Sequence, residues 1–168
     1  FKYPRQVDLA NEDSIDKFSS EVKNDGVKVD ALINNAGAFL NKPFEKISKK
    51  EFEYIFQVNV FGLSSITRKV LPIIDSKGHI VNITSMGGIN GAAKFDGLSA
   101  YSSSKGAVNI LTELLAEEYK EKGPSFNALA FGAVQTEMLE EAFPGLKAPI
   151  SAKEIADFVL DFALTGHK

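Results

Sequence analysis

The chain has 168 residues, of which 44% are hydrophobic and 24% are charged, and its net charge is −3. This composition is typical of one soluble globular domain and excludes a disordered chain. Because no cluster of Lys or Arg stands out, the charge gives no case for binding nucleic acid or an anionic membrane. A small molecule is the favoured partner.

Cysteine is absent, which excludes disulfides, thiol nucleophiles and Cys-ligated zinc. The two histidines, His79 and His167, do not form a metal-binding spacing, so we expect no metal site and interpret each as a strand-end or surface residue. No apolar stretch approaches the roughly 20 residues of a membrane span, and no signal pattern opens the chain. These features predict a cytoplasmic protein.

In the first half of the chain, apolar runs typical of strands alternate with helical patterns. Residues 7–9 are interpreted as the end of a strand. Residues 11–23 predict a helix, because apolar residues recur at three- and four-residue spacing and acidic residues stand at its start. A strand over 29–33 ends in the turn 34–37. A long helix over 48–74 opens with a capping pattern of Ser followed by Glu three residues later.

The second half continues the alternation with two strands, two main helices and two loops. The predicted elements are a strand over 79–83, a glycine-rich loop through 97, a helix over 100–119, a strand over 126–131, a loop over 132–149 with a short helix, and a helix over 151–164.

This alternation predicts an α/β fold with a doubly wound, Rossmann-like parallel sheet in three α/β/α layers. No repeat or linker interrupts it, so residues 1–168 are interpreted as a single domain. Such sheets usually open with a strand, a glycine-rich phosphate turn and a helix, and that unit is not present. The segment Gly87–Gly91 follows a strand but lacks the Gly-x-Gly-x-x-Gly spacing, so we interpret it as a loop.

Tyr101 and Lys105 are the most informative pair, because residues four apart at the start of a helix lie on one face. A tyrosine titrates near pH ~10, so it is a poor acid–base catalyst unless a nearby positive charge stabilises its phenolate. Lys105 can supply that charge, which predicts a lowered pKa for Tyr101. Because this spacing also arises by chance on any helix, other residues must show whether the pair is functional.

Three neighbouring features supply that context. Ser85 ends a strand at the edge where parallel sheets bind ligands, and it could hold a substrate carbonyl or hydroxyl. The small residues of Asn34–Gly37 allow close backbone approach to a ligand, although a turn chosen for conformation alone is the alternative. Asn59 lies within an apolar helix, where a buried amide needs hydrogen-bond partners, and this favours a functional role.

Taken in order, five motifs resemble the short-chain dehydrogenase/reductase family. They are Asn-Asn-Ala-Gly, Asn-Val-x-Gly, Val-Asn-Ile-Thr-Ser, Tyr-x-x-x-Lys and Asn-Ala-x-x-x-Gly with a later Thr, and the similarity runs from about Val7 to Thr136. Each motif alone is modest, but five in order at plausible separations are hard to obtain by chance.

The resemblance implies roles for individual residues. Asn59, Ser85, Tyr101 and Lys105 would form a catalytic tetrad, in which Asn59 supports a water path for protons to Lys105. The implied cofactor contacts are Asp8 and Leu9 beside the adenine, Asn35, Ala36 and Gly37 along the nucleotide, Lys105 at the nicotinamide ribose, and Gly132, Val134 and Thr136 in the segment that follows the nicotinamide and its phosphates. Tyr101 is also implied to bind the cofactor.

The implied activity is an NAD(P)-dependent oxidoreductase that transfers a hydride between NAD or NADP and a carbonyl or alcohol substrate, with Tyr101 as the general acid or base. Apolar positions on more than one side of the helices over 48–74 and 100–119 fit the homodimer or homotetramer that the resemblance implies. Two alternatives are a non-enzymatic scaffold or regulator that kept the fold, and an epimerase or dehydratase of an extended relative.

The sequence departs from the family pattern in four ways. The phosphate turn and the elements before it are absent, so the choice between NAD and NADP cannot be read. The segment between Ser85 and Tyr101 is longer than usual, with Lys94–Gly97 as an insertion that borders the substrate or forms a plain surface bulge. Phe131 replaces the usual proline before Gly132. A final strand is also missing, so we expect a fragment whose sheet is incomplete at both ends.

Overall fold

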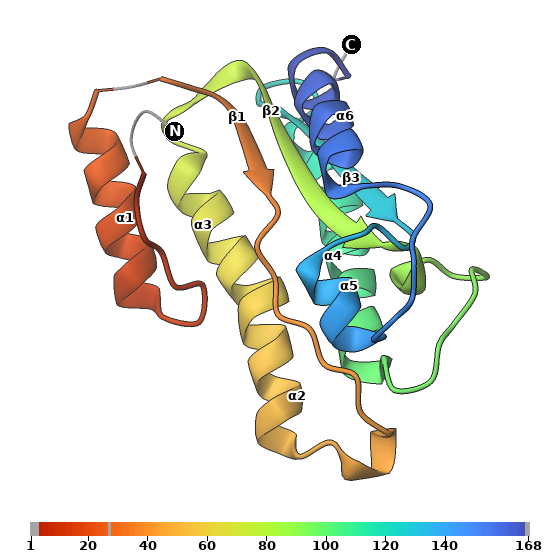
Figure 1. The fold of residues 1–168 in the computed structure, drawn as a ribbon. Helices are drawn as coiled ribbons and strands as arrows, with labels where there is room; N and C mark the ends of the chain where they lie inside the picture. The colour runs from red at the N-terminus through yellow and green to blue at the C-terminus, as the bar shows by residue number, and fades with distance from the viewer. Residues whose placement is uncertain (1–3, 27, 167–168) are drawn as a thin grey trace.

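A computed structural model describes residues 4–26 and 28–166, in which three strands alternate with helices (Figure 1). The strands are β1 (Val29–Asn34), β2 (Ile74–Ser85) and β3 (Ser125–Phe131). The helices are α1 (Glu12–Asn24), α2 (Lys49–Phe56), α3 (Leu63–Val70), α4 (Ser99–Tyr119), α5 (Glu137–Ala142) and α6 (Ala152–Thr165).

Several helices begin where a polar side chain accepts a hydrogen bond from the first turn. The side chain of Asn11 accepts from Ser14 at the start of α1. Ser48 and Ser151 each form a reciprocal capping box with a glutamate three residues later, at α2 and α6. The predicted start of the helix at Ser48 is therefore confirmed.

The three strands form one parallel sheet in the order β1-β2-β3. The β2–β3 register is regular, from His79 opposite Ser125 to Ser85 opposite Phe131. The β1–β2 register is irregular near its start, because Val29 pairs with Ile74 while Ala31 pairs with His79. All three carboxyl ends therefore lie at the same edge of the sheet, where parallel strands deliver side chains to a ligand.

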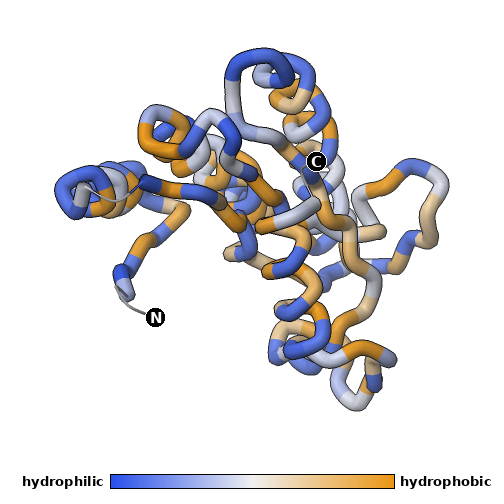
Figure 2. The backbone as a smooth tube through the Cα atoms, turned by 90° about the horizontal axis from the view of Figure 1, so that it is seen from above, coloured by the Kyte–Doolittle hydropathy of each residue, from blue (hydrophilic) through white to orange (hydrophobic). Residues whose placement is uncertain are grey.

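Helices cover both faces of this sheet. α3 and α4 pack on the face that carries Asn34 and Asn82, while α6 packs on the face that carries His79 (Figure 1). Figure 2 shows hydrophobic and hydrophilic residues interleaved along the helices, as amphipathic packing on a sheet requires. The predicted α/β fold with a parallel Rossmann-like sheet and flanking helices is confirmed, and the sheet has three strands among the described residues.

The main core cluster lies between the sheet and the helices α1 and α3. It contains the buried residues Ile15, Ile66, Val70, Ile74, Ile80 and Phe126. These side chains come from four elements, α1, α3, β2 and β3, that are far apart in the sequence. Their burial therefore stabilises the sheet and both helices as one unit.

A chain of buried polar side chains crosses the same face of the sheet. The amide of Asn34 donates to Thr67 of α3 (3.1 Å) and to Asn82 of β2 (2.8 Å). The amide of Asn82 in turn donates to Thr112 of α4 (2.8 Å). Because hydrogen bonds satisfy these groups, they add specificity to the packing of two helices on two strands without leaving orphaned polar atoms.

Three expectations about secondary structure are wrong in detail. Residues 7–9 do not belong to a strand, since no neighbouring strand in the described part of the chain pairs with them. The helix expected over 48–74 is interrupted by a π-helical turn over Gln57–Gly62, and α3 ends at Val70. Residues 74–78 extend β2 instead, although their sequence, Ile-Asp-Ser-Lys-Gly, lacks the apolar alternation of a strand, and the pairing with β1 is irregular there.

His79 is a fully enclosed residue and not the strand-end or surface residue that we expected. Its side chain is 1% exposed, with Nδ1 3.1 Å from the carbonyl oxygen of Ala163 and Nε2 2.8 Å from Oδ1 of Asn127. Its ring also packs against Phe162, so the imidazole links β2 to α6 and β3. His167 lies outside the described residues.

Across 4–26 and 28–166, no helix is both long enough and apolar enough to cross a bilayer. The same residues contain no group of three or more His, Asp or Glu side chains arranged to hold a metal ion.

Candidate active site

Tyr101 and Lys105 lie on the first turns of α4, on the side that faces the end of β2. The Nζ atom of Lys105 lies 5.9 Å from the centroid of the Tyr101 ring and donates to the carbonyl oxygen of Ile83 (2.8 Å). The Lys105 side chain is 5% exposed. The last residues of β2 therefore fix the amine of Lys105 one helical turn from the tyrosine.

Ser85 lies at the carboxyl end of β2, beside the phenol of Tyr101. Its hydroxyl accepts a hydrogen bond from the backbone N–H of Gly87 (3.2 Å) and lies near enough to the Tyr101 phenol to act on the pKa of that group. Strand β2 positions Ser85, and helix α4 positions Tyr101. The contact between a strand end and a helix start thus places two hydroxyl groups together at the sheet edge.

Asn59 lies in the π-helical turn between α2 and α3 and is 1% exposed. Its Oδ1 accepts from the backbone N–H of Ala38 (2.7 Å), and its Nδ2 donates to the carbonyl of Ala38 (2.9 Å) and to the hydroxyl of Ser104 (2.9 Å). π-helical turns occur frequently at functional sites. This amide joins the segment after β1 to helix α4, next to Lys105.

Gly37 brings the segment after β1 against both of these side chains. A Cβ atom at this position would lie 3.1 Å from Oδ1 of Asn59 and 3.4 Å from Nζ of Lys105. A side chain at residue 37 would therefore crowd Asn59 and contact the lysine. Asn35 and Ala36 directly precede it and are exposed at the carboxyl end of β1.

The amine of Lys105 retains hydrogen-bonding capacity. An ammonium group carries three donors, and among the described residues one acceptor, the Ile83 carbonyl, takes up one of them. A buried cation with unused donors favours a polar ligand, because an unsatisfied buried group is costly. Lys105, together with Gly37, therefore fits the hydroxyl groups of a nucleotide ribose.

Burial changes the acid–base properties of both groups. It lowers the pKa of Lys105 to about 8, because a low-dielectric environment disfavours the ammonium form. Burial also raises the pKa of Tyr101 above its ordinary value, while the Ser85 hydroxyl opposes that rise. The lowered Tyr101 pKa that we expected from Lys105 is therefore not found, because desolvation dominates and Lys105 Nζ is directed to the Ile83 carbonyl.

The remaining predicted cofactor residues lie on two other segments, one before α1 and one between β3 and α5. Leu9 packs against Gly62, where a Cβ atom would overlap the Leu9 carbonyl, so Asp8 and Leu9 lie beside the π-helical turn. Thr136 caps α5 by accepting from Leu139 (3.2 Å), and Gly132 is exposed. Within the described part of the chain, no hydrogen bond or ring contact joins Asp8, Leu9, Gly132, Val134 or Thr136 to the four catalytic candidates.

Sequence reasoning missed residues that build the site through their backbone or through ring contacts. The carbonyls of Ala38 and Ile83 hold Asn59 and Lys105, and the ring of Phe39 lies 4.8 Å from that of Tyr101. Gly88 also matters, because its Cβ would lie 2.6 Å from the backbone nitrogen of Gly106. The presence of glycine at both positions, 88 and 106, was the one signal in the sequence that could have revealed this contact, since close backbone approach needs small residues.

The fold and the site define an α/β protein with a Ser, Tyr and Lys group at the carboxyl edge of a parallel sheet. The family model of short chain dehydrogenases matches residues 2–147. The chain therefore belongs to the short chain dehydrogenase family, as the motifs predicted.

Individual relatives agree with this assignment. The chain is 38% identical to an L-2,3-butanediol dehydrogenase of Corynebacterium glutamicum over 140 residues, 80% of this chain and 51% of the relative. It is 32% identical to a cyclopentanol dehydrogenase of a Comamonas species over 151 residues, 89% of this chain and 58% of the relative. The chain thus spans between half and three-fifths of the length of these relatives.

The fold also matches solved structures. The crystal structure of a short chain dehydrogenase from Shigella flexneri, complexed with NADP, superimposes with a TM-score of 0.83 at 21% identity, covering 94% of this chain and 67% of that one. At this identity the similarity establishes the fold.

Proposed function

We propose that the complete protein is an NAD(P)-dependent oxidoreductase that interconverts an alcohol and a carbonyl compound. The observation that carries the proposal is the Tyr101 phenol beside Ser85, with the buried amine of Lys105 one helical turn away, 5.9 Å from the centroid of the Tyr101 ring. Family membership and the names of the relatives, dehydrogenases of cyclopentanol and butanediol, support this class of substrate.

NAD or NADP fits the residues around Lys105, and the NADP complex of the related structure supports this choice of ligand. Lys105 would hold ribose hydroxyls with its unused donors, and Asn35, Ala36 and Gly37 would lie along the nucleotide. We assign Asp8 and Leu9 to the adenine side, and Gly132, Val134 and Thr136 to the nicotinamide side. When bound, the nicotinamide supplies the hydride acceptor or donor that no side chain here provides.

The protein's own residues would manage the proton. Because burial raises its pKa, Tyr101 is a neutral phenol at physiological pH and is ready to give its proton to a carbonyl oxygen during reduction. Ser85 would hold the same oxygen, and charged Lys105 would stabilise the phenolate that remains. In oxidation Tyr101 must first lose its proton, so we expect the oxidation rate to rise with pH.

Asn59 would act as a positioning residue in this scheme. Its amide hydrogen-bonds Ala38 and Ser104, and this fixes the segment that carries Gly37 against the helix that carries Lys105. We also propose that protons reach Lys105 through a path of water molecules that passes Asn59.

The test is turnover by the complete natural protein. NAD and NADP are each combined with cyclopentanol and 2,3-butanediol, and NADH and NADPH with the matching ketones, while reduced nicotinamide is followed by absorbance. Replacing Tyr101→Phe should lower kcat by about 100-fold or more with the fold intact, since general acid–base catalysis contributes ~10²–10⁴-fold. Tyr119→Phe is the matched control, because this tyrosine packs on Phe126 away from the site.

Undiminished turnover by Tyr101→Phe would exclude the assignment of the proton donor. Binding of a nicotinamide cofactor without turnover of any alcohol or ketone would instead favour the regulator or scaffold.

A homodimer or homotetramer is the assembly we propose. Phe61 after α2 and Ile110 and Leu114 on α4 are more than half exposed, an unusual position for large apolar side chains. Leu63, by contrast, is buried within the chain, and Leu111 and Leu115 are partly buried. A monomeric mass by light scattering of the complete protein would exclude this assembly.

A further inference from the structure

The segments that follow the three strands meet at two adjacent residues, Asn41 and Lys42. The backbone N–H of Lys42 donates to the carbonyl of Gly97, in the loop after β2 (2.9 Å). The side-chain amide of Asn41 donates to the carbonyl of Ala142, the last residue of α5 after β3 (3.0 Å). Asn41 and Lys42 themselves follow β1, so this contact, which we call the loop junction, joins all three.

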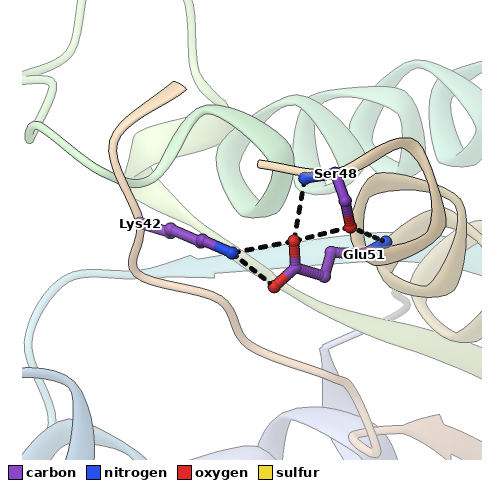
Figure 3. Close-up of polar contacts among 3 residues, drawn as sticks. All are labelled: Lys42, Ser48 and Glu51. Atoms are coloured by element: carbon purple, nitrogen blue, oxygen red, sulfur yellow. Dashed lines mark hydrogen bonds and ion pairs between the residues drawn. The ribbon is translucent and has the colours of Figure 1, made fainter. Parts of the chain in front are cut away.

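The loop junction is fastened to α2 by an ion pair. The amine of Lys42 donates to both carboxylate oxygens of Glu51 (2.7 and 3.0 Å), and Glu51 also accepts from the backbone and the hydroxyl of Ser48 (2.8 and 2.7 Å) (Figure 3). The hydrogen bond from Lys42, followed by those from Ser48, lowers the pKa of Glu51 to about 2. A paired carboxylate at the first turn of α2 therefore anchors Lys42.

Gly97 is required at the junction for two separate reasons. Its φ of +82° lies in the left-handed region that disfavours side chains. In addition, a Cβ atom there would overlap Oδ1 of Asn41 and lie 3.2 Å from the Lys42 nitrogen. Gly91 in the same loop has nearly the same φ of +79°, but a Cβ atom there would meet nothing within 4 Å. Alanine at either position would therefore strain the backbone, but only alanine at position 97 would also disturb the contact with Asn41.

The junction lies next to the catalytic residues. Phe39, two residues before Asn41, packs its ring on that of Tyr101 at 4.8 Å. The segments that the junction joins carry exposed apolar side chains, with Phe95 64% and Met138 38% exposed. Exposed apolar side chains on segments that are joined next to the catalytic candidates favour an apolar alcohol or ketone.

We propose that Asn41 and Lys42 are positioning residues that hold the loop over 89–98 and helix α5 together, and that this loop junction limits the size of the apolar substrate. The size limit rests on the proposed oxidoreductase function. The joining of the three segments does not, so the two parts can be tested separately.

The first measurement is hydrogen exchange of the complete protein without substrate. Gly97→Ala should speed amide exchange in residues 137–147 by about 3- to 10-fold, the equivalent of one or two surface hydrogen bonds. Gly91→Ala introduces the same left-handed alanine without the overlap, so it should change exchange in this segment less than 2-fold. Equal effects of the two variants would overturn the junction, because backbone strain alone would then explain both.

A second pair of variants tests the side chain of Asn41. Asn41→Asp keeps the shape but replaces the donor to Ala142 with a carboxylate oxygen, so α5 should exchange faster while the Lys42–Gly97 contact remains. Asn90→Asp places the same charge in the neighbouring loop as a control. If both aspartates act alike, charge rather than the hydrogen bond is responsible, and the assignment of Asn41 fails.

The size limit is measured with cyclopentanol and the bulkier cyclooctanol. Gly97→Ala should raise the ratio of kcat/KM for cyclooctanol to that for cyclopentanol by about 3- to 10-fold, mainly through KM, and Gly91→Ala should leave it unchanged. Faster exchange with an unchanged ratio would overturn the size limit. A wild-type protein with no turnover would instead overturn the proposed function, and the exchange results would still decide the junction.

Discussion

Two clusters of polar side chains in this protein differ in how deeply they are buried. The catalytic candidates Asn59 and Lys105 are 1% and 5% exposed, and their hydrogen bonds go to the backbone of Ala38 and Ile83 and to the hydroxyl of Ser104. The loop junction around Lys42 and Glu51 lies at the surface, where each side chain is about one-third exposed. The proposed catalytic residues are thus held in the packed interior, whereas the proposed size limit would depend on weaker surface contacts, which can change without disturbing that interior.

The largest expected effect separates catalysis from stability at Lys105. We expect Lys105→Met to lower kcat of the complete protein by about 100-fold or more, since the phenolate of Tyr101 loses its neighbouring cation. At pH 7 the same variant should be more stable by roughly 1–3 kcal/mol, because burying the ammonium costs free energy. Kinetics and urea unfolding measure the two effects.

The pH dependence of unfolding sharpens this prediction. Lys105 has a pKa of about 8 when folded and an ordinary value of 10.5, so between these values the unfolded chain binds the additional proton. The free energy of unfolding should therefore rise from pH 8 to 10.5 in the wild type, and Lys105→Met should lack this contribution. Lys122→Met is the control, since this lysine also lies over a tyrosine ring but is exposed. An equal slope in Lys105→Met and the wild type would contradict the prediction.

The next effect concerns Asn59. Asn59→Ala removes the partners of the Ala38 N–H, the Ala38 carbonyl and the Ser104 hydroxyl, and should cost about 2–4 kcal/mol in urea unfolding. Asn109→Ala is a matched control, because this buried asparagine makes one hydrogen bond of 3.3 Å and leaves its Oδ1 without a partner. Equal losses would mean that the cavity, and not the hydrogen bonds, determines the cost.

The smallest effect is expected at the surface, at Thr136. Thr136→Ala removes the cap of α5 and should cost about 0.5–2 kcal/mol locally, as faster hydrogen exchange in residues 137–142. The midpoint of global unfolding should hardly move, since α5 contains no buried residue. Thr165→Ala serves as the control, because that hydroxyl hydrogen-bonds within α6. A global loss as large as that of Asn59→Ala would contradict the division between interior and surface.

Much of the fold was predictable because the signals were local. Capping residues such as Ser48 and Ser151 marked helix starts within a residue or two, and apolar runs marked the regular parts of all three strands. The π-helical turn over Gln57–Gly62 was not predictable, because π turns are rare and nothing in the residue types of this stretch distinguishes one from an α-helical turn. The burial of His79 depends on Ala163 and Asn127, which are distant in sequence, so no local pattern could reveal it.

The site shows the same division. The contact of Ser85 with Tyr101 and the approach of Gly37 to Lys105 follow from parallel strands that end at one edge, and sequence reasoning expected both residues there. The backbone carbonyls of Ala38 and Ile83 carry no sequence signal, because every residue has one. The predicted lowering of the Tyr101 pKa was wrong for a similar reason, because the extent to which a side chain is buried is a property of the whole fold.

The polar chain through Asn34, Asn82 and Thr112 has an evolutionary consequence. Each amide is bonded on two sides, so replacing one member leaves its neighbours unsatisfied, while replacing several together by apolar residues can restore a consistent core. Substitutions at these positions should therefore be strongly epistatic. Descendants of this sequence are expected to keep all of these hydrogen-bonded polar residues or to replace them together.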